Sequence, residues 1–151
     1  MAYIHDLRQK VGHMPLILNS ASGALVNDQG AVLLQERADT GNWGFPGGYL
    51  EYGESYAKCV QREYLEDAGI HVKPIKLLAL QDYDEYTYPN DDVVQPINAF
   101  YLVEATTTTN QAPKPSETVT IKYFALNQEP PCFFNAQHAR MWEILRQVVL
   151  G

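Results

Sequence analysis

The sequence is short of cysteine and of long apolar runs. Its two cysteines, Cys59 and Cys132, are too few for a disulfide framework and have no nearby Cys or His at zinc-site spacing, so we expect two reduced thiols. There is no run of about 18 apolar residues, so no membrane-spanning helix is expected. The N-terminus lacks the apolar core of a signal peptide, and we therefore expect a cytoplasmic protein.

Basic residues are also scarce, and this sets the net charge. Eighteen acidic residues stand against 11 Lys and Arg, which gives a formal charge of -7 at pH 7. Binding of nucleic acid or of an anionic membrane by bulk charge is therefore not expected. A chain this acidic needs a local device, such as a cation or a helix terminus, to handle phosphate groups. The 151 residues, 46% of them hydrophobic, suit one domain with one core.

The apolar periodicity predicts strands and helices in an order that defines a fold class. Helices are predicted over 3–12, 54–68 and 136–149, strands over 15–27, 31–35, 72–80, 93–103 and 118–126, and loops over 37–53, 82–92 and 105–116. The turn residues Asn27-Asp28-Gln29-Gly30 predict that the first two strands form a hairpin. Pro96 favours an edge or a bulge in its strand. The order predicts an α/β fold in which helices cover both faces of a mixed sheet.

Residues 48–70, GYLEYGESYAKCVQREYLEDAGI, carry the main chemical signal. Glu63, Glu66 and Asp67 stand at positions i, i+3 and i+4, so their carboxylates converge on one helix face. Close like charges repel and raise each other's pKa, and a hard divalent cation with oxygen ligands relieves that repulsion. A solvated acidic face paired with the basic residues of the same helix explains the spacing equally well, and spacing alone leaves both interpretations open.

The same segment resembles the signature box of the Nudix hydrolases. The family pattern is Gly, five residues, Glu, seven residues, Arg-Glu, an aliphatic, any residue, Glu-Glu, any residue, Gly and an aliphatic. The matching residues are Gly48, Glu54, Arg62, Glu63, Glu66, Gly69 and Ile70. The preceding Trp43-Gly44-Phe45-Pro46-Gly47 also resembles the usual lead-in. Tyr64 replaces the usual aliphatic, and Asp67, one methylene shorter, replaces the second Glu.

The resemblance implies a Nudix-type α/β/α sandwich with a mixed β-sheet and a metal-dependent pyrophosphohydrolase activity. Matched position by position, Glu63, Glu66 and Asp67 would be ligands of Mg²⁺ or, as a substitute, Mn²⁺, and Gly47 would offer its backbone carbonyl. Arg62 would orient the glutamates by charge-assisted hydrogen bonds. Glu54 would hold the loop to the helix and assist the attacking water, which the metal orients toward phosphorus.

Two residues outside the box are further candidates. Many family members carry another acid on a distant loop, and Glu117, at the end of the polar loop 105–116, is the candidate here. An ordinary exposed loop acid is the alternative. Arg37 follows the strand 31–35, and the equivalent Arg in some relatives binds substrate phosphate, for which a forked donor is suited. A surface arginine is the alternative.

The acidic loop 82–92 bears on the substrate because Tyr86 and Tyr88 offer faces for base stacking. In the family, a Tyr at this distance past the box tends to accompany dinucleoside polyphosphates, and a Pro tends to accompany ADP-ribose. Tyr86 and Tyr88 lie 16 and 18 residues after Ile70, and Pro89 lies 19 after it. These tyrosines could instead anchor the loop or a dimer interface.

The resemblance therefore predicts hydrolysis of a nucleoside diphosphate linked to another group, either ADP-ribose-like or a dinucleoside polyphosphate. The alternatives are a pyrophosphatase for oxidised or ordinary nucleoside triphosphates and, because of Asp67, a weakly catalytic regulatory domain that binds nucleotides. A coenzyme A substrate is not expected because the additional upstream motif is missing, and the acidic charge disfavours messenger-RNA decapping. Homodimers are common among relatives, although the sequence itself does not show one.

Overall fold

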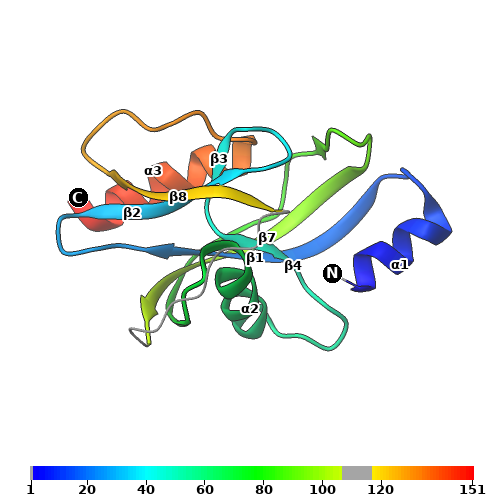
Figure 1. The fold of residues 1–151 in the computed structure, drawn as a ribbon, viewed down its shortest axis with the longest axis horizontal. Coiled ribbons are helices and arrows are strands. Elements are labelled where there is room, and N and C mark those ends of the chain that lie inside the picture. The colour runs from blue at the N-terminus through cyan, green and yellow to red at the C-terminus, as the bar shows by residue number, and fades with distance from the viewer. Residues whose placement is uncertain (1, 107–116) are drawn as a thin grey trace.

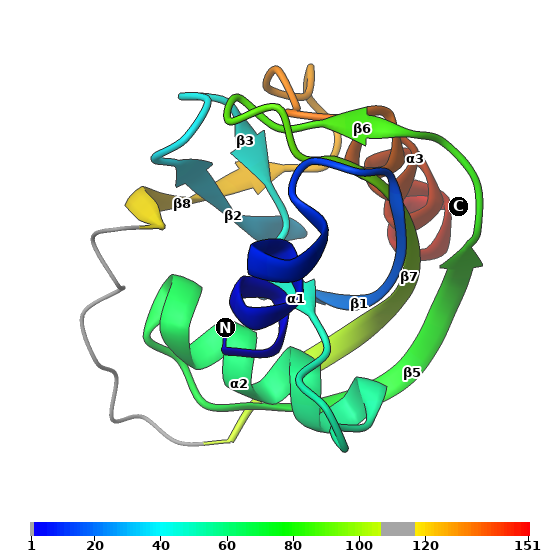
Figure 2. The same cartoon turned by 90° about the vertical axis from the view of Figure 1, so that its right-hand side faces the viewer.

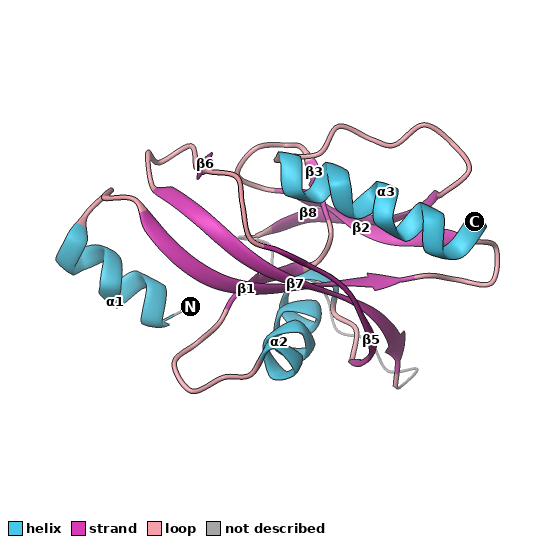
Figure 3. Ribbon diagram, turned by 180° about the vertical axis from the view of Figure 1, so that it is seen from behind, coloured by secondary structure: helices cyan, strands magenta, loops and turns pink. Residues whose placement is uncertain are grey.

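The computed structural model describes residues 2–106 and 117–151. The predicted loop 105–116 therefore lies almost wholly outside the described residues. Eleven elements follow one another along the described chain: α1 (Ala2–Val11), β1 (Leu16–Leu25), β2 (Ala31–Arg37), β3 (Trp43–Gly44), β4 (Gly47–Tyr49), α2 (Tyr56–Ala68), β5 (Val72–Gln81), β6 (Tyr86–Thr87), β7 (Val93–Ala105), β8 (Thr118–Ala125) and α3 (Ala136–Leu150). The short strands β3, β4 and β6 lie inside segments that the sequence predicts to be loops (Figure 1 for β3 and β4, Figure 3 for β6).

The strands form two sheets between two helices. The larger sheet has the order β4-β1-β7-β5 with β6 beside β7, and the smaller has the order β3-β2-β8. Strands β1 and β7 pair in parallel while every other described pair is antiparallel, so the larger sheet is mixed. Helices α2 and α3 lie on opposite sides of the strands (Figure 3). The predicted α/β/α sandwich with a mixed sheet is confirmed.

Each helix buries its own hydrophobic cluster against the strands. The α2 cluster joins Cys59, Val60, Tyr64 and Ala68 to residues of β1, β2, β5 and β7, and the α3 cluster joins Met141, Trp142 and Leu145 to Phe45, Phe100 and Leu126. Leu33 belongs to the first cluster while Val32 and Leu34 belong to the second. Side chains alternate between the two faces of a strand, so β2 contributes to both cores.

Helix α2 begins and ends at residues that stop a helix for clear physical reasons. The Ser55 side chain accepts a hydrogen bond from the Lys58 N–H at 3.1 Å, which satisfies a donor that the first turn leaves free. Gly69 follows the last turn with φ of 71°, a left-handed conformation that glycine adopts without a steric penalty. These two residues fix where α2 begins and ends.

The predicted hairpin is present only beside its turn. The Asn27 side chain accepts hydrogen bonds from the N–H groups of Gln29 and Ala31, and the described contacts between the two segments are the antiparallel bridge Val26–Val32 and the hydrogen bond from the Asn27 N–H to the Ala31 carbonyl at 2.8 Å. Strand β1 instead pairs along its whole length with β7, and β2 pairs with β8. Local periodicity identifies a strand but not its partner, and here the partners are distant in sequence.

Pro96 lies on β7, in the interior of the larger sheet rather than in an edge strand. On one side Pro96 is opposite Leu18 of β1. On the other side the pairing with β5 stops at Asn98 and the pairing with β6 starts at Val94, so position 96 has no strand partner there. This local gap tolerates a residue that has no N–H to donate.

Helix α1 lies outside the sandwich at one end (Figures 1 and 2), and none of its residues is buried. The Glu51 carboxylate accepts hydrogen bonds from the Ala2 and Tyr3 N–H groups, which joins α1 to the loop before α2. Arg8 donates to the Val93 carbonyl at 2.8 Å. Among the described residues, no helix is both long enough and apolar enough to cross a membrane.

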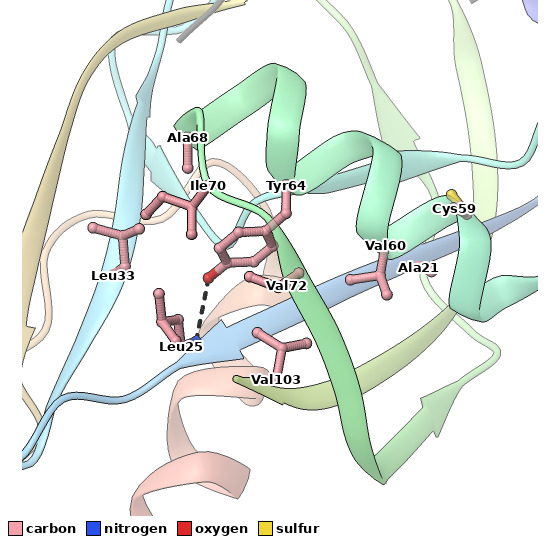
Figure 4. Packing of buried hydrophobic residues seen from close by; sticks show 10 residues of the cluster. All are labelled: Ala21, Leu25, Leu33, Cys59, Val60, Tyr64, Ala68, Ile70, Val72 and Val103. Carbon is pink, nitrogen blue, oxygen red and sulfur yellow. Dashed lines mark hydrogen bonds between the residues drawn. The ribbon is translucent and has the colours of Figure 1, made fainter. Parts of the chain in front are cut away.

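Tyr64, the residue that departs from the aliphatic position of the box, is the centre of the α2 core (Figure 4). Its ring is fully buried, and its hydroxyl accepts a hydrogen bond from the Leu25 N–H at 3.2 Å. Tyr64→Phe is expected to lower the free energy of unfolding by about 1–3 kcal/mol, because it leaves a buried N–H without an acceptor. Urea unfolding measures this, and an unchanged midpoint would show that the Leu25 N–H finds another partner.

Candidate metal and substrate site

Three carboxylates from two distant segments meet at one point of the surface. Glu63 and Glu66 project from α2, and Glu117 directly precedes β8. One oxygen from each of the three lies within 4.8 Å of the others. Glu63 is buried, and Glu66 and Glu117 are half-buried. The pairing of β8 with β2 brings Glu117 here, since Arg37 of β2 is opposite Thr118.

Arg62 binds the acids of α2 to the loop that precedes the helix. Its Nε and Nη2 donate to the two carboxylate oxygens of Glu54 at 2.8 and 2.9 Å, and its Nη1 donates to Glu63 at 2.9 Å. Its Nη2 also donates to the Tyr49 carbonyl at 3.0 Å. The Arg62 hydrogen bonds lower the pKa of Glu54, so that carboxylate is held ionised in an ion pair. Glu54 thus joins the loop to the helix, in a position separate from the group of three acids.

Asp67 stands beside the group of three rather than in it. Its side chain is 2% exposed, and its Oδ2 accepts hydrogen bonds from the Gly47 N–H at 3.0 Å and from Gln35 Nε2 at 3.1 Å. The Thr118 hydroxyl lies 2.6 Å from Gln35 Oε1 and 2.9 Å from the Asp67 carbonyl oxygen. Asp67 therefore connects the lead-in loop and β2 through its side chain, and the start of β8 through its backbone carbonyl.

Burial and crowding make the acidic site electrostatically unfavourable in the absence of a cation. Burial raises the pKa of Glu63 most strongly; Arg62 opposes this rise, and Glu66 and Glu117 add to it. The pKa of Asp67 is also raised well above its usual range, mainly by burial and next by the nearby charge of Glu63. A hard divalent cation would relieve this repulsion, and carboxylate oxygens are the ligands that Mg²⁺ prefers. The residues present therefore fit such an ion.

Gly48 approaches Glu63 so closely that no side chain fits between them. A Cβ on Gly48 would lie 2.5 Å from the Glu63 carboxyl carbon, whereas a Cβ on Gly47 would lie 2.4 Å from the Ala21 carbonyl oxygen. Gly48→Ala is expected to displace the Glu63 carboxylate and weaken Mn²⁺ binding by about 10–100-fold, as for changes that misplace a ligand. Calorimetric titration with Mn²⁺ measures this effect.

Gly47→Ala is the matched comparison for that titration. Its clash is with backbone, so it should lower the melting temperature of the metal-free protein more than Gly48→Ala does. Equal metal affinity in the wild-type protein and in Gly48→Ala would contradict the placement of Glu63 in the metal site.

Two neighbouring cavities lie at or beside this acidic site. The larger has a volume of about 270 Å³ and is lined by Glu63, Asp67 and Glu117 among others. The narrower has a volume of about 40 Å³ and is lined by Asn98, Phe134 and His138 among others. Both cavities are lined by Arg37, Gly47, Gly48, Tyr49 and Tyr88. The two cavities are therefore adjacent.

Of the three residues expected to bind substrate, Arg37 and Tyr88 line both cavities. Arg37 donates two hydrogen bonds to Asp39, at 3.0 and 2.9 Å, and its guanidinium carbon lies 3.9 Å from the centre of the Phe134 ring. Tyr86 lines neither of these two cavities and packs edge-on against Tyr88 and Phe134, with ring centres 4.7 and 5.4 Å away. It therefore supports the wall of the site from behind.

Comparison with known proteins identifies the family to which the chain belongs. A family model described as the NUDIX domain matches residues 17–148. The chain belongs to the Nudix family. Among solved structures, this Nudix domain is similar to a MutT NUDIX hydrolase from Burkholderia pseudomallei, with a TM-score of 0.69, 25% identity and coverage of 84% of this chain and 96% of the other. An ADP-ribose pyrophosphatase from Streptococcus suis shares the fold, with a TM-score of 0.68 at 23% identity over 87% of this chain and 90% of the other.

Curated relatives of this Nudix domain carry several activities in their names. A Bacillus subtilis protein with the provisional name ADP-ribose pyrophosphatase YjhB is 29% identical over 129 residues, which cover 85% of this chain and 60% of the relative. An RNA pyrophosphohydrolase from Psychrobacter cryohalolentis is 38% identical over 66 residues, which cover 43% of this chain and 38% of the relative. The matches thus span at most about three fifths of the length of these relatives.

The sequence pattern does not identify several residues that line or support the site. Gln35 and Asn98 are single polar residues inside buried strands, and Tyr49 belongs to a segment read as loop. Gln35 could have been noticed, because it ends the apolar run Ala-Val-Leu-Leu and is itself 2% exposed. Phe134 gives no signal, because nothing local in the sequence places it beside Arg37.

Proposed function

We propose that this Nudix domain hydrolyses the diphosphate linkage of a nucleoside diphosphate joined to another group, using Mg²⁺ or Mn²⁺. The observation that carries the proposal is the meeting of Glu63, Glu66 and Glu117, each with one oxygen within 4.8 Å of the others, in a member of the Nudix family. Oxygen donors of this kind suit Mg²⁺. Asp67 and the Gly47 carbonyl complete the proposed metal surroundings from the adjoining loop.

The geometry supports a separate role for each residue of the site. When bound, the metal neutralises the diphosphate, lowers the pKa of a water molecule and orients that water toward phosphorus. Arg62 fixes the Glu63 carboxylate through the hydrogen bond at 2.9 Å, while its ion pair with Glu54 keeps the loop in place. A carboxylate of the acidic group accepts the proton of the attacking water. Arg37, on the wall shared by both cavities, contacts a phosphate of the substrate.

The substrate that we favour is ADP-ribose-like or a dinucleoside polyphosphate. The name of the Bacillus subtilis relative supports the first, and the position of Tyr88 on the cavity wall supports the second. A relative from Homo sapiens named 8-oxo-dGDP phosphatase matches a shorter stretch, at 37% identity over 60 residues, and its name favours an oxidised nucleotide as the second candidate.

A competition assay separates these substrates. ADP-ribose, diadenosine polyphosphates and 8-oxo-dGTP are offered together with Mg²⁺, and the nucleotide products are separated and quantified. We expect one of the first two to be consumed fastest. Preferential consumption of 8-oxo-dGTP would replace our choice of substrate by the oxidised nucleotide, and the absence of any product would support a regulatory domain that only binds nucleotides.

A further inference from the structure

Asn98 of β7 has a feature that the proposed hydrolysis leaves unexplained. It is 3% exposed, and its Nδ2 donates to the Ser22 hydroxyl at 3.0 Å, which leaves Oδ1 as the free atom of the amide. Asn98 Oδ1 is buried and has no hydrogen-bond partner. Such groups destabilise a fold and usually have a functional reason. Elsewhere in the described chain the same holds only for Trp142 Nε1, which lies in the α3 core.

Unlike Trp142, Asn98 lines a cavity. The narrow cavity of about 40 Å³ has room for a small polar group but not for a whole ring. It is adjacent to the larger cavity of about 270 Å³, which the acidic residues line, because Tyr49 and Tyr88 are among the residues that line both. A ring held in the larger cavity can therefore direct one substituent toward Asn98.

The shared wall favours a flat ring. The hydroxyls of Tyr49 and Tyr88 lie 2.6 Å apart, and their rings pack at 69° to each other, so both side chains are fixed in place. Arg37 lies over Phe134, lines the narrow cavity together with these tyrosines, and adds a planar cation. Aromatic and guanidinium planes of this kind stack on heteroaromatic rings, and a single buried polar atom then sets the orientation of the ring.

We propose that the narrow cavity binds the exocyclic amino group of a nucleobase, with Asn98 Oδ1 as the hydrogen-bond acceptor. The inference rests on the proposed function, since the base belongs to the nucleoside diphosphate whose diphosphate lies at the acidic group. An amide oxygen accepts and cannot donate, so it pairs with an amino group and repels a carbonyl at the same position. Adenine, guanine and cytosine fit this site, whereas hypoxanthine and uracil do not.

Nucleoside binding tests the proposal without any turnover. Adenosine is compared with inosine, and cytidine with uridine, by NMR titration of the metal-free protein, because the members of each pair differ by an amino group replaced with a carbonyl. We expect the amino member of at least one pair to bind about tenfold more tightly, the effect of one buried hydrogen bond. Asn98→Leu is expected to abolish that preference, and Asn98→Asp, which keeps an acceptor oxygen, is expected to retain it.

Trp142→Phe is the matched control. It removes the other buried polar atom without a partner, at a place away from both cavities, and should leave the preference unchanged. The proposal is overturned if no nucleoside binds, if neither pair is discriminated, or if the preference survives in Asn98→Leu. If the wild-type protein discriminates neither pair, the proposal is overturned whether or not the Asn98 variants fold.

The nucleoside-binding result and the proposed hydrolysis can fail independently of each other. A protein that prefers amino nucleosides but hydrolyses nothing would refute the hydrolysis alone, because nucleosides carry no diphosphate. Mg²⁺-dependent hydrolysis without any amino preference would refute the role of Asn98 alone.

Discussion

Glu66→Gln is expected to lower kcat by at least about 100-fold, the upper range for changes that only misplace a metal ligand. Replacing Glu66 should disturb the fold little, because its side chain is 30% exposed and its contact with Arg62 is long, at 3.5 Å. The substitution removes a negative charge while it keeps the shape of the side chain. The measurement is the steady-state rate of nucleoside monophosphate release with saturating Mg²⁺, together with the melting temperature.

The control for this variant is Glu104→Gln. Glu104 lies on β7 and its side chain is 63% exposed, beside Lys73 at 4.0 Å, an exposed pair that contributes little to stability. Its kcat should equal that of the wild-type protein. If Glu66→Gln also turned over at the wild-type rate, the acidic group would have no part in the reaction.

Asp67→Glu is expected to lower activity and stability, although Glu is the usual residue of the family box at this position. Asp67 Oδ2 is enclosed between the Gly47 N–H and Gln35 Nε2, at 3.0 and 3.1 Å. An additional methylene in such a packed place costs about 1–3 kcal/mol and would displace either the lead-in loop or β2. Urea unfolding and kcat, measured on the same preparation, report both effects.

Asp28→Glu provides the matched control for the added methylene, because Asp28 lies in the exposed turn between β1 and β2. It should leave the unfolding midpoint and kcat unchanged. A large gain of activity in Asp67→Glu would instead favour the regulatory alternative, in which the shorter acid has weakened an ancestral metal site.

The sequence predicts the local parts of the site well because local spacing determines them. The acidic face of α2 follows from the helical repeat, and the predicted helix 54–68 differs from α2 only at its start, where Ser55 is the N-terminal cap. The helical ranges alone do not identify every buried residue: Ala57 and Val148 are exposed, whereas Cys59 and Trp142 are buried in the cores.

The remaining parts of the site depend on strand pairing, which spacing does not reveal. Glu117 reaches Glu63 because β8 pairs with β2, and the predicted hairpin of the first two strands would have given β2 a different neighbour. Asn98 lines the narrow cavity because the parallel pairing of β7 with β1 sets it against Ser20 and places its amide on Ser22. Neither contact can be inferred from the order of residues along the chain.

The requirement for a divalent cation tests the central claim most directly. Release of nucleoside monophosphate from ADP-ribose and from diadenosine polyphosphates is measured with Mg²⁺, after addition of EDTA, and after Mg²⁺ is restored. We predict turnover of at least one of these substrates that stops with EDTA and returns with the metal, because the carboxylates of Glu63, Glu66 and Glu117 need a cation before a diphosphate can approach them. Turnover that continues in EDTA, or no turnover of either substrate with Mg²⁺, would contradict it.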